Sequence, residues 1–185
     1  KDGRPVLIDI GVETYSAQTF SDRRYDIWTM QSGWHNLPSF GGVMQSNGAA
    51  FAASDVQVDL GPARALLSME LAGAWPPEAR LRSFRRQAAL IRGDSVLIED
   101  HYDGDLPAEL SLILAQQPQR TAEGLVLDGL CRIMIRGTRD IRVERRPVLD
   151  PRLRSAWPAE LWRVRIGPDA LQPFMPRQSL SLRLM

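Results

Sequence analysis

The stretch of residues 19–38 concentrates side chains that could do chemistry in a region of weak periodicity. Tyr25 and Trp34 supply aromatic rings, and His35 is followed directly by Asn36. An imidazole can transfer a proton near neutral pH or bind a metal, and polar loops on a rigid sheet often hold binding groups. We therefore expect a site here. A core imidazole that is hydrogen-bonded to the backbone is the alternative interpretation of His35.

Other catalytic groups are scarce in the sequence. His35 and His101 are the two histidines in 185 residues, so a conventional histidine-based apparatus has few places to form. The sequence contains no Gly-x-Ser-x-Gly elbow, no phosphate-binding glycine loop and no HExxH motif. His101 stands in an acidic cluster at a predicted strand end, where we expect it to be exposed, with adventitious metal binding as the alternative. No complete catalytic set can be recognised.

The composition excludes several broad classes of protein. Cys131 is the single cysteine, so neither an intrachain disulfide nor a cysteine zinc cluster can form, and its apolar surroundings predict a buried, inert thiol. The 23 Lys and Arg residues are interspersed with 22 Asp and Glu residues, which does not indicate nucleic acid binding. No stretch approaches the roughly 20 apolar residues of a membrane span. The length and the 44% hydrophobic content fit one domain.

The elements that must position these side chains are predicted to be strands. Apolar and polar residues alternate in many short segments, which is typical of strands with one buried face and one wet face. This pattern predicts an all-β, antiparallel, two-layer β-sandwich of about twelve strands with little helix. The strands are expected at residues 6–10, 42–45, 50–58, 65–71, 79–91, 95–100, 109–115, 124–127, 131–136, 141–144, 162–166 and 179–184.

Two segments allow a helix as the alternative. Residues 80–88 could form a basic helix, but Gly93 and Asp94 follow and an apolar run resumes, which favours strand, turn and strand. The arginines are then a solvated face, with polyanion binding as the alternative. Residues 63–74 are rich in good helix formers, and we predict a strand there as well. Residues 147–158 are expected to form the longest irregular connection.

The first residues have the chemistry of a hairpin turn. Residues 1–4 read Lys-Asp-Gly-Arg and lead into the apolar run of residues 5–10. We expect a strand before Lys1 to pair across this turn, so that residues 1–185 form one sandwich domain at the C-terminal end of a longer protein. The alternative is that Lys1 follows a cleaved tag or signal peptide.

Two motifs resemble those of a known family. Residues 3–11 contain Asp9-x-Gly11, and residues 28–38 contain His35-Asn36; the run at residues 85–100 is similar to the family's paired strands. Over residues 3–103 the sequence resembles the C-terminal β-sandwich domain of the heparinase II/III-like family. Such proteins are similar to polysaccharide lyases that cleave uronic-acid-containing chains by β-elimination. The resemblance implies that an N-terminal α-helical toroid supplies the catalytic groups, so none is complete in this chain.

The resemblance also implies roles for particular residues. Asp9 and His35 match metal ligands of the family, and another histidine would come from the strand before Lys1. Zn²⁺ takes about four ligands in a structural site, so this chain would hold half a site and bind metal weakly or not at all. Arg24, Tyr25, Trp34 and Asn36 are the candidate substrate-binding residues, with packing or surface solvation as the alternative for the first three.

The resemblance therefore implies that this chain forms one wall of a cleft for a uronate polysaccharide and is inactive in isolation. Asn36 is followed by Leu37 and Pro38, which departs from the family's usual pattern and leaves the substrate class open. The resemblance favours a periplasmic or secreted bacterial protein, with the cytoplasm as the alternative. A non-catalytic carbohydrate-binding module and a purely structural sandwich are the alternative functions.

Overall fold

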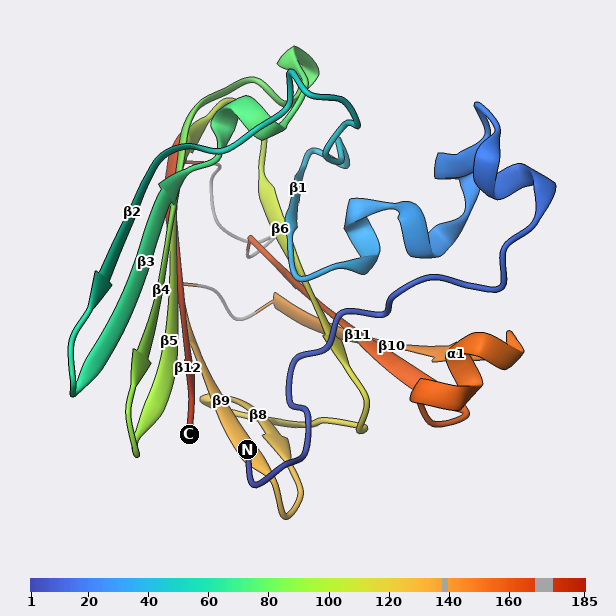
Figure 1. The fold of residues 1–185 in the computed structure, drawn as a ribbon. Coiled ribbons are helices and arrows are strands. Elements are labelled where there is room, and N and C mark those ends of the chain that lie inside the picture. The colour runs from blue at the N-terminus through green and yellow to red at the C-terminus, as the bar shows by residue number, and fades with distance from the viewer. Residues whose placement is uncertain (138–139, 169–174) are drawn as a thin grey trace.

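The computed structural model describes residues 1–137, 140–168 and 175–185, and its strands pack as two antiparallel sheets (Figure 1). The larger sheet has the strand order β2-β3-β4-β5-β12-β9-β8-β7, and the smaller has the order β1-β6-β11-β10. Every pairing between named strands in these residues is antiparallel. The predicted all-β sandwich is therefore confirmed.

The larger sheet consists of two series of consecutive hairpins, with the last strand of the chain inserted between them. Its strands are β2 (Ser54–Leu60), β3 (Arg64–Glu70), β4 (Leu81–Ile91), β5 (Ser95–Gly104), β7 (Gln119–Thr121), β8 (Gly124–Leu127), β9 (Cys131–Arg136) and β12 (Arg177–Leu184). Of the helix-prone residues 63–74, Arg64–Glu70 form β3 as predicted, because pairing with β2 and β4 outweighs their helical propensity, whereas residues 72–74 form a 3-10 turn and not a strand.

The smaller sheet lies over part of the larger one (Figure 1). Its strands are β1 (Pro38–Phe40), β6 (Ala108–Leu114), β10 (Asp140–Pro147) and β11 (Glu160–Gly167). The stretch before β1 contains four short 3-10 helices, η1 (Ala17–Phe20), η2 (Arg24–Asp26), η3 (Trp28–Met30) and η4 (Ser32–Trp34). Two more, η5 (Ala72–Ala74) and η6 (Pro77–Ala79), connect β3 to β4.

Two predicted strands are wrong. Residues 6–10 form no regular strand and make one isolated bridge, between Leu7 and Leu114. Residues 42–45 are not a strand either, because Gly41 and Gly42 take positive φ angles of 57° and 86° and turn the chain back so that Val43 bridges Phe40. The strand here is β1, which the sequence pattern missed because three residues are too few to show alternation.

The connection at residues 147–158 is not wholly irregular. It contains the helix α1 (Pro151–Ala156), which Asp150 caps by accepting a hydrogen bond from the Leu153 N–H at 3.0 Å. An Asp cap followed by Pro at the first helical position is a recognisable start signal. No helix in the described part of the chain has the length and apolar character needed to cross a bilayer.

An aromatic cluster holds the two sheets together. Phe40 of β1 lies with its ring centroid 5.8 Å from that of Phe84 of β4 and 5.4 Å from that of Tyr102 of β5. Trp75 completes the cluster, with ring centroids 5.5 Å from Phe40 and 5.4 Å from Phe84. These residues expose at most 6% of their surface. This core fixes β1, and with it the residues that immediately precede β1, against the larger sheet.

Candidate functional site

Asp9 and His35 lie in contact although 26 residues separate them. The Asp9 Oδ2 atom is 2.8 Å from the His35 Nδ1 atom. Asp9 stands between the buried residues Ile8 and Ile10, so its side chain points outward and is 70% exposed, whereas that of His35 is 26% exposed. The Gly11 N–H donates to Asp9 Oδ1 at 3.0 Å, which fixes the other carboxylate oxygen. The pair forms a rim between the N-terminal segment and η4.

The second ring nitrogen of His35 also faces an acceptor. Nε2 lies 3.1 Å from the backbone carbonyl oxygen of Thr29. A carbonyl oxygen and an ionised carboxylate can only accept, so both hydrogen bonds form together when the imidazole carries a proton on each nitrogen. In that state the ring is a cation, held between Asp9 and the backbone.

The charge of Asp9 suits this arrangement. Partial burial raises the pKa of its carboxyl, but the hydrogen bonds from Gly11 and His35 and the charge of His35 outweigh it, so the pKa lies below its ordinary value. The carboxylate is therefore ionised at neutral pH. Asp9 then presents an ionised acceptor to the Nδ1 atom of His35.

Asn36 binds backbone at both ends of its side-chain amide. Its Nδ2 donates to the Ile8 carbonyl oxygen at 2.9 Å, and its Oδ1 accepts from the Ile113 N–H at 2.9 Å. Its own carbonyl oxygen accepts from Nη1 of Arg86 at 2.9 Å. The structure thus places this predicted substrate-binding residue in the framework of the site.

An open hollow of about 500 Å³ lies beside the Asp9–His35 pair. Gln45, Ser46 and Asn47 form a polar stretch of its wall that the sequence analysis did not select. The run Gln-Ser-Asn-Gly, a polar turn after an apolar segment, was the signal that could have identified it. The full wall consists of Asp9, Tyr25, Met30, Ser32, His35, Asn36, Leu37, Gln45, Ser46 and Asn47.

Tyr25 lines this hollow and is 43% exposed, so its ring is available to a ligand. Arg24 is exposed next to it, with the guanidinium carbon 5.8 Å from the Tyr25 ring centroid, but it is not part of the wall. Trp34 is not part of the wall either. Its ring packs edge-on against Trp28 with centroids 4.9 Å apart, and Arg163 covers it.

The described residues do not by themselves fit a zinc site. Asp9 and His35 provide two ligand atoms, and no group of three or more His, Cys, Asp and Glu side chains gathers anywhere in the described ranges. Both imidazole nitrogens of His35 already face acceptors. A structural zinc site requires about four ligands, so any metal here would need donors from outside this set.

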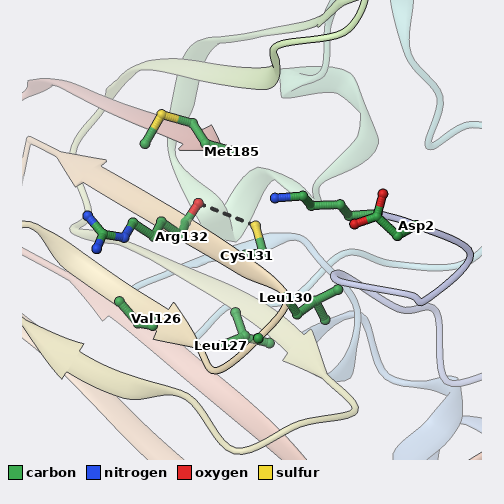
Figure 2. A pocket seen from close by; sticks show the side chains of 9 residues that line it. Asp2, Val126, Leu127, Leu130, Cys131, Arg132 and Met185 are labelled. Atoms are coloured by element: carbon green, nitrogen blue, oxygen red, sulfur yellow. Dashed lines mark hydrogen bonds between the residues drawn. The ribbon is translucent and has the colours of Figure 1, made fainter.

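The remaining candidates stand apart from the site. His101 lies on β5, exposed, opposite Arg85 and Ser179. Cys131 lines a second hollow, which shares no residue with the first, and its Sγ donates to the Arg132 carbonyl oxygen at 3.3 Å (Figure 2). Burial raises the pKa of the Cys131 thiol, so the predicted inert, protonated thiol agrees with its surroundings.

Comparison with known proteins gives a result at the level of the fold. No family model matches the sequence, and no curated protein matches it. Among solved structures, heparinase III matches with a TM-score of 0.63 and 16% identity over 100% of this chain. The heparan sulfate lyase HepC from Pedobacter heparinus matches with a TM-score of 0.60 and 14% identity over 98% of this chain. The chain has the fold of a heparinase-like domain.

This chain corresponds to a minor part of those proteins. It covers 28% of the heparinase III chain and 29% of the HepC chain. A methylated-lysine heparinase III structure gives the same result, with a TM-score of 0.63 and 11% identity over 99% of this chain and 28% of that one. The similarity therefore describes how this chain folds.

Proposed function

We propose that this chain is the β-sandwich domain of a polysaccharide lyase, and that it forms one wall of a cleft for a uronic-acid-containing polysaccharide. The observation that carries the proposal is the match of the whole chain to heparinase III, with a TM-score of 0.63. Fold alone does not specify function, and the hollow beside Asp9 and His35 gives the proposal its second support.

The wall of the hollow has the chemistry of a sugar-binding surface. Tyr25 offers an exposed aromatic ring, and the amides of Gln45 and Asn47 offer donors and acceptors for hydroxyl groups. Asp9 and His35 add a polar pair at the edge of the hollow, in which the hydrogen bond to Asp9 holds the His35 ring in place. These groups bind and orient a chain of sugars.

β-Elimination also needs a base that removes the proton alpha to the uronate carboxylate and a group that stabilises the resulting enolate. We propose that a helical domain elsewhere in a longer polypeptide supplies both. The location of that polypeptide, periplasmic or secreted, remains a prediction. The complete translated gene tests the domain arrangement: several hundred residues of helical periodicity before residue 1 support it, and their absence contradicts it.

A non-catalytic carbohydrate-binding module is the second candidate. It is favoured by a pair of exposed aromatic rings in the loop region, Tyr15 and Phe20, which are 55% and 76% exposed and have centroids 5.5 Å apart. Exposed rings of this kind can stack on sugars without any chemistry. The two candidates differ in whether product forms.

The test uses the full-length protein on a panel of polyuronates and glycosaminoglycans. Lyase action is followed as the absorbance of the unsaturated uronate product. We expect activity on at least one polymer, a loss of at least tenfold in His35→Ala, and wild-type activity in the control His101→Ala. Binding without product on every polymer would establish the carbohydrate-binding module, and neither binding nor product would contradict both candidates.

A further inference from the structure

The N-terminal segment meets β6 through an interrupted hydrogen-bond ladder. In a regular antiparallel pair, two opposite residues exchange both N–H to carbonyl hydrogen bonds. Here the Ile8 N–H donates to the Ile113 carbonyl oxygen at 3.0 Å, but the return bond is replaced. The Ile113 N–H donates to Asn36 Oδ1, and Asn36 Nδ2 donates to the Ile8 carbonyl oxygen, each at 2.9 Å. One side-chain amide completes the ladder.

The Asn36–Ile8 hydrogen bond lies next to the Asp9–His35 contact along both chain segments. Ile8 precedes Asp9, and Asn36 follows His35. The Asn36–Ile8 hydrogen bond therefore joins the same two segments as the Asp9–His35 hydrogen bond, one residue away on each side. Because Asp9 lies outside any regular strand, this second link restricts where its carboxylate can lie.

The backbone of Asn36 is fixed from the opposite sheet. Arg86 Nη1 donates to the Asn36 carbonyl oxygen at 2.9 Å, and its Nε and Nη2 donate to both carboxylate oxygens of Asp100 at 2.7 and 2.6 Å. The Tyr102 hydroxyl donates to Asp100 at 2.7 Å, and the Asp100 side chain is 1% exposed. Two forked bonds to a buried carboxylate leave the guanidinium little freedom.

We infer that Asn36 and Arg86 are positioning residues, which set the contact between Asp9 and His35. Neither the Asn36 side-chain amide nor the Arg86 guanidinium contacts a ligand in this role. The chain of contacts runs from Asp100 on β5 through Arg86 on β4 to Asn36 and then to Ile8. That the positioned pair serves a polysaccharide site rests on the proposed function, whereas the positioning itself rests on these hydrogen bonds alone.

The two histidines make the test direct. Protein labelled with ¹⁵N-histidine gives signals from two imidazole rings, and the ring of His101 on β5 serves as the internal reference. In the wild type we expect a downfield Nδ1–H proton of His35, bonded to a carboxylate, and its loss in Asp9→Asn. Asn36→Asp keeps the acceptor for Ile113 but removes the donor to Ile8. We expect it to abolish the same signal while the His101 signals stay in place.

Asn47→Asp is the matched control, because it makes the same change on an exposed residue of the same hollow. A folded Asn36→Asp protein that keeps the wild-type His35 signal would overturn the inference, even if its stability were reduced. If Asn36→Asp does not fold, hydrogen exchange in the wild-type protein tests the inference instead. Side-chain amide protons of Asn36 should exchange with solvent at least tenfold more slowly than those of Asn47, and equal rates would overturn the inference.

The activity assay separates this inference from the proposed function. In full-length protein, positioning predicts that Asn36→Asp lowers kcat by at least tenfold. The control Gln119→Glu makes the same amide-to-carboxylate change on an exposed residue of β7 outside the hollow and should leave kcat unchanged. A displaced His35 signal together with no wild-type activity on any polymer would retain the positioning role and remove the lyase. If the full-length protein is an active lyase and Asn36→Asp keeps the wild-type His35 signal, the proposed function is retained and the positioning role is removed.

Discussion

The guanidinium carbon of Arg163 lies 4.1 Å from the centroid of the Trp34 ring. Arg146 approaches the same ring at 5.3 Å and that of Trp28 at 4.6 Å, so the Trp34 indole contacts cations from both β10 and β11. A residue that the sequence analysis selected for sugar binding thus packs against the smaller sheet. Tyr25, nine residues earlier, is the ring that faces the hollow.

The first prediction separates these two aromatic residues. Trp34→Ala should reduce the free energy of unfolding by about 2–3 kcal/mol, because it removes a half-buried ring and its contacts. Tyr25→Ala should change stability by about 0.5 kcal/mol or less but weaken binding to uronate oligosaccharides. Urea unfolding and titration calorimetry on the full-length protein measure the two effects. Weaker binding in Trp34→Ala at unchanged stability would show that Trp34 contacts the sugar.

The second prediction concerns the buried ion pair of Arg86 and Asp100. Asp100→Ala should cost about 3–5 kcal/mol of stability, because it leaves the Arg86 guanidinium buried without its carboxylate. The double variant Arg86→Met, Asp100→Leu should lose much less than the sum of the single variants. Arg82→Ala, which removes a cation exposed at 51%, is the control and should change the urea midpoint little. Equal losses of stability in Asp100→Ala and Arg82→Ala would contradict the burial of the Arg86–Asp100 ion pair.

The third prediction is a pH dependence from Glu144. Partial burial raises the pKa of its carboxyl, but hydrogen bonds and charges from Arg165 and Arg163 outweigh this and lower the pKa below the ordinary 4.5. Its stabilising effect is therefore complete above pH 4.5 and is lost as the pH falls through the lower pKa of the folded state. Glu144→Gln should be less stable than the wild type at pH 7, and the difference should shrink on acidification.

Urea unfolding at several pH values measures this difference, with Glu123→Gln on the exposed turn between β7 and β8 as the control. A constant difference between Glu144→Gln and the wild type across the acid range would show that the ion pairs do not contribute.

The fourth prediction concerns Gly124, which has a φ of 144° at the start of β8. A methyl group there would collide with the backbone carbonyl oxygen of Ile133 on β9. Gly124→Ala should therefore be strongly destabilising. Gly93→Ala is the control, since its φ of 75° carries strain of about 1 kcal/mol but nothing lies within 4 Å of the added methyl. Similar melting temperatures for the two variants would contradict the close approach of β8 and β9.

The fifth prediction concerns metal. Because Asp9 and His35 contribute two ligand atoms and the described residues bring no third acid, His or Cys to them, elemental analysis of residues 1–185 should find zinc far below one equivalent. Stoichiometric zinc that disappears in His35→Ala would contradict this, and would show that the pair recruits ligands from a neighbouring molecule. Zinc in a longer protein remains a prediction.

The sequence by itself determined the architecture of this protein. Alternation in residues 131–136 and 162–166 predicted β9 and β11, because the side chains of a strand point to opposite faces with a period of two and this is a local property. The same rule failed at residues 6–10, where the pattern was present but the ladder that would make a strand was not. Ile8 and Ile10 are buried as the pattern requires, yet the Asn36 amide takes the place of the neighbouring backbone.

The site was decided by tertiary structure. Residue types indicated His35 and Asn36, and the family resemblance implied that Asp9 and His35 belong to one site. The tertiary structure added that these two side chains share a hydrogen bond and that Asn36 completes a backbone ladder. Likewise, nothing local distinguishes Tyr25 from Trp34, since the covering cations arrive from β10 and β11, more than a hundred residues away in sequence. Hydrogen bonds and ring contacts between distant segments depend on how the two sheets pack, and no short-range pattern encodes them.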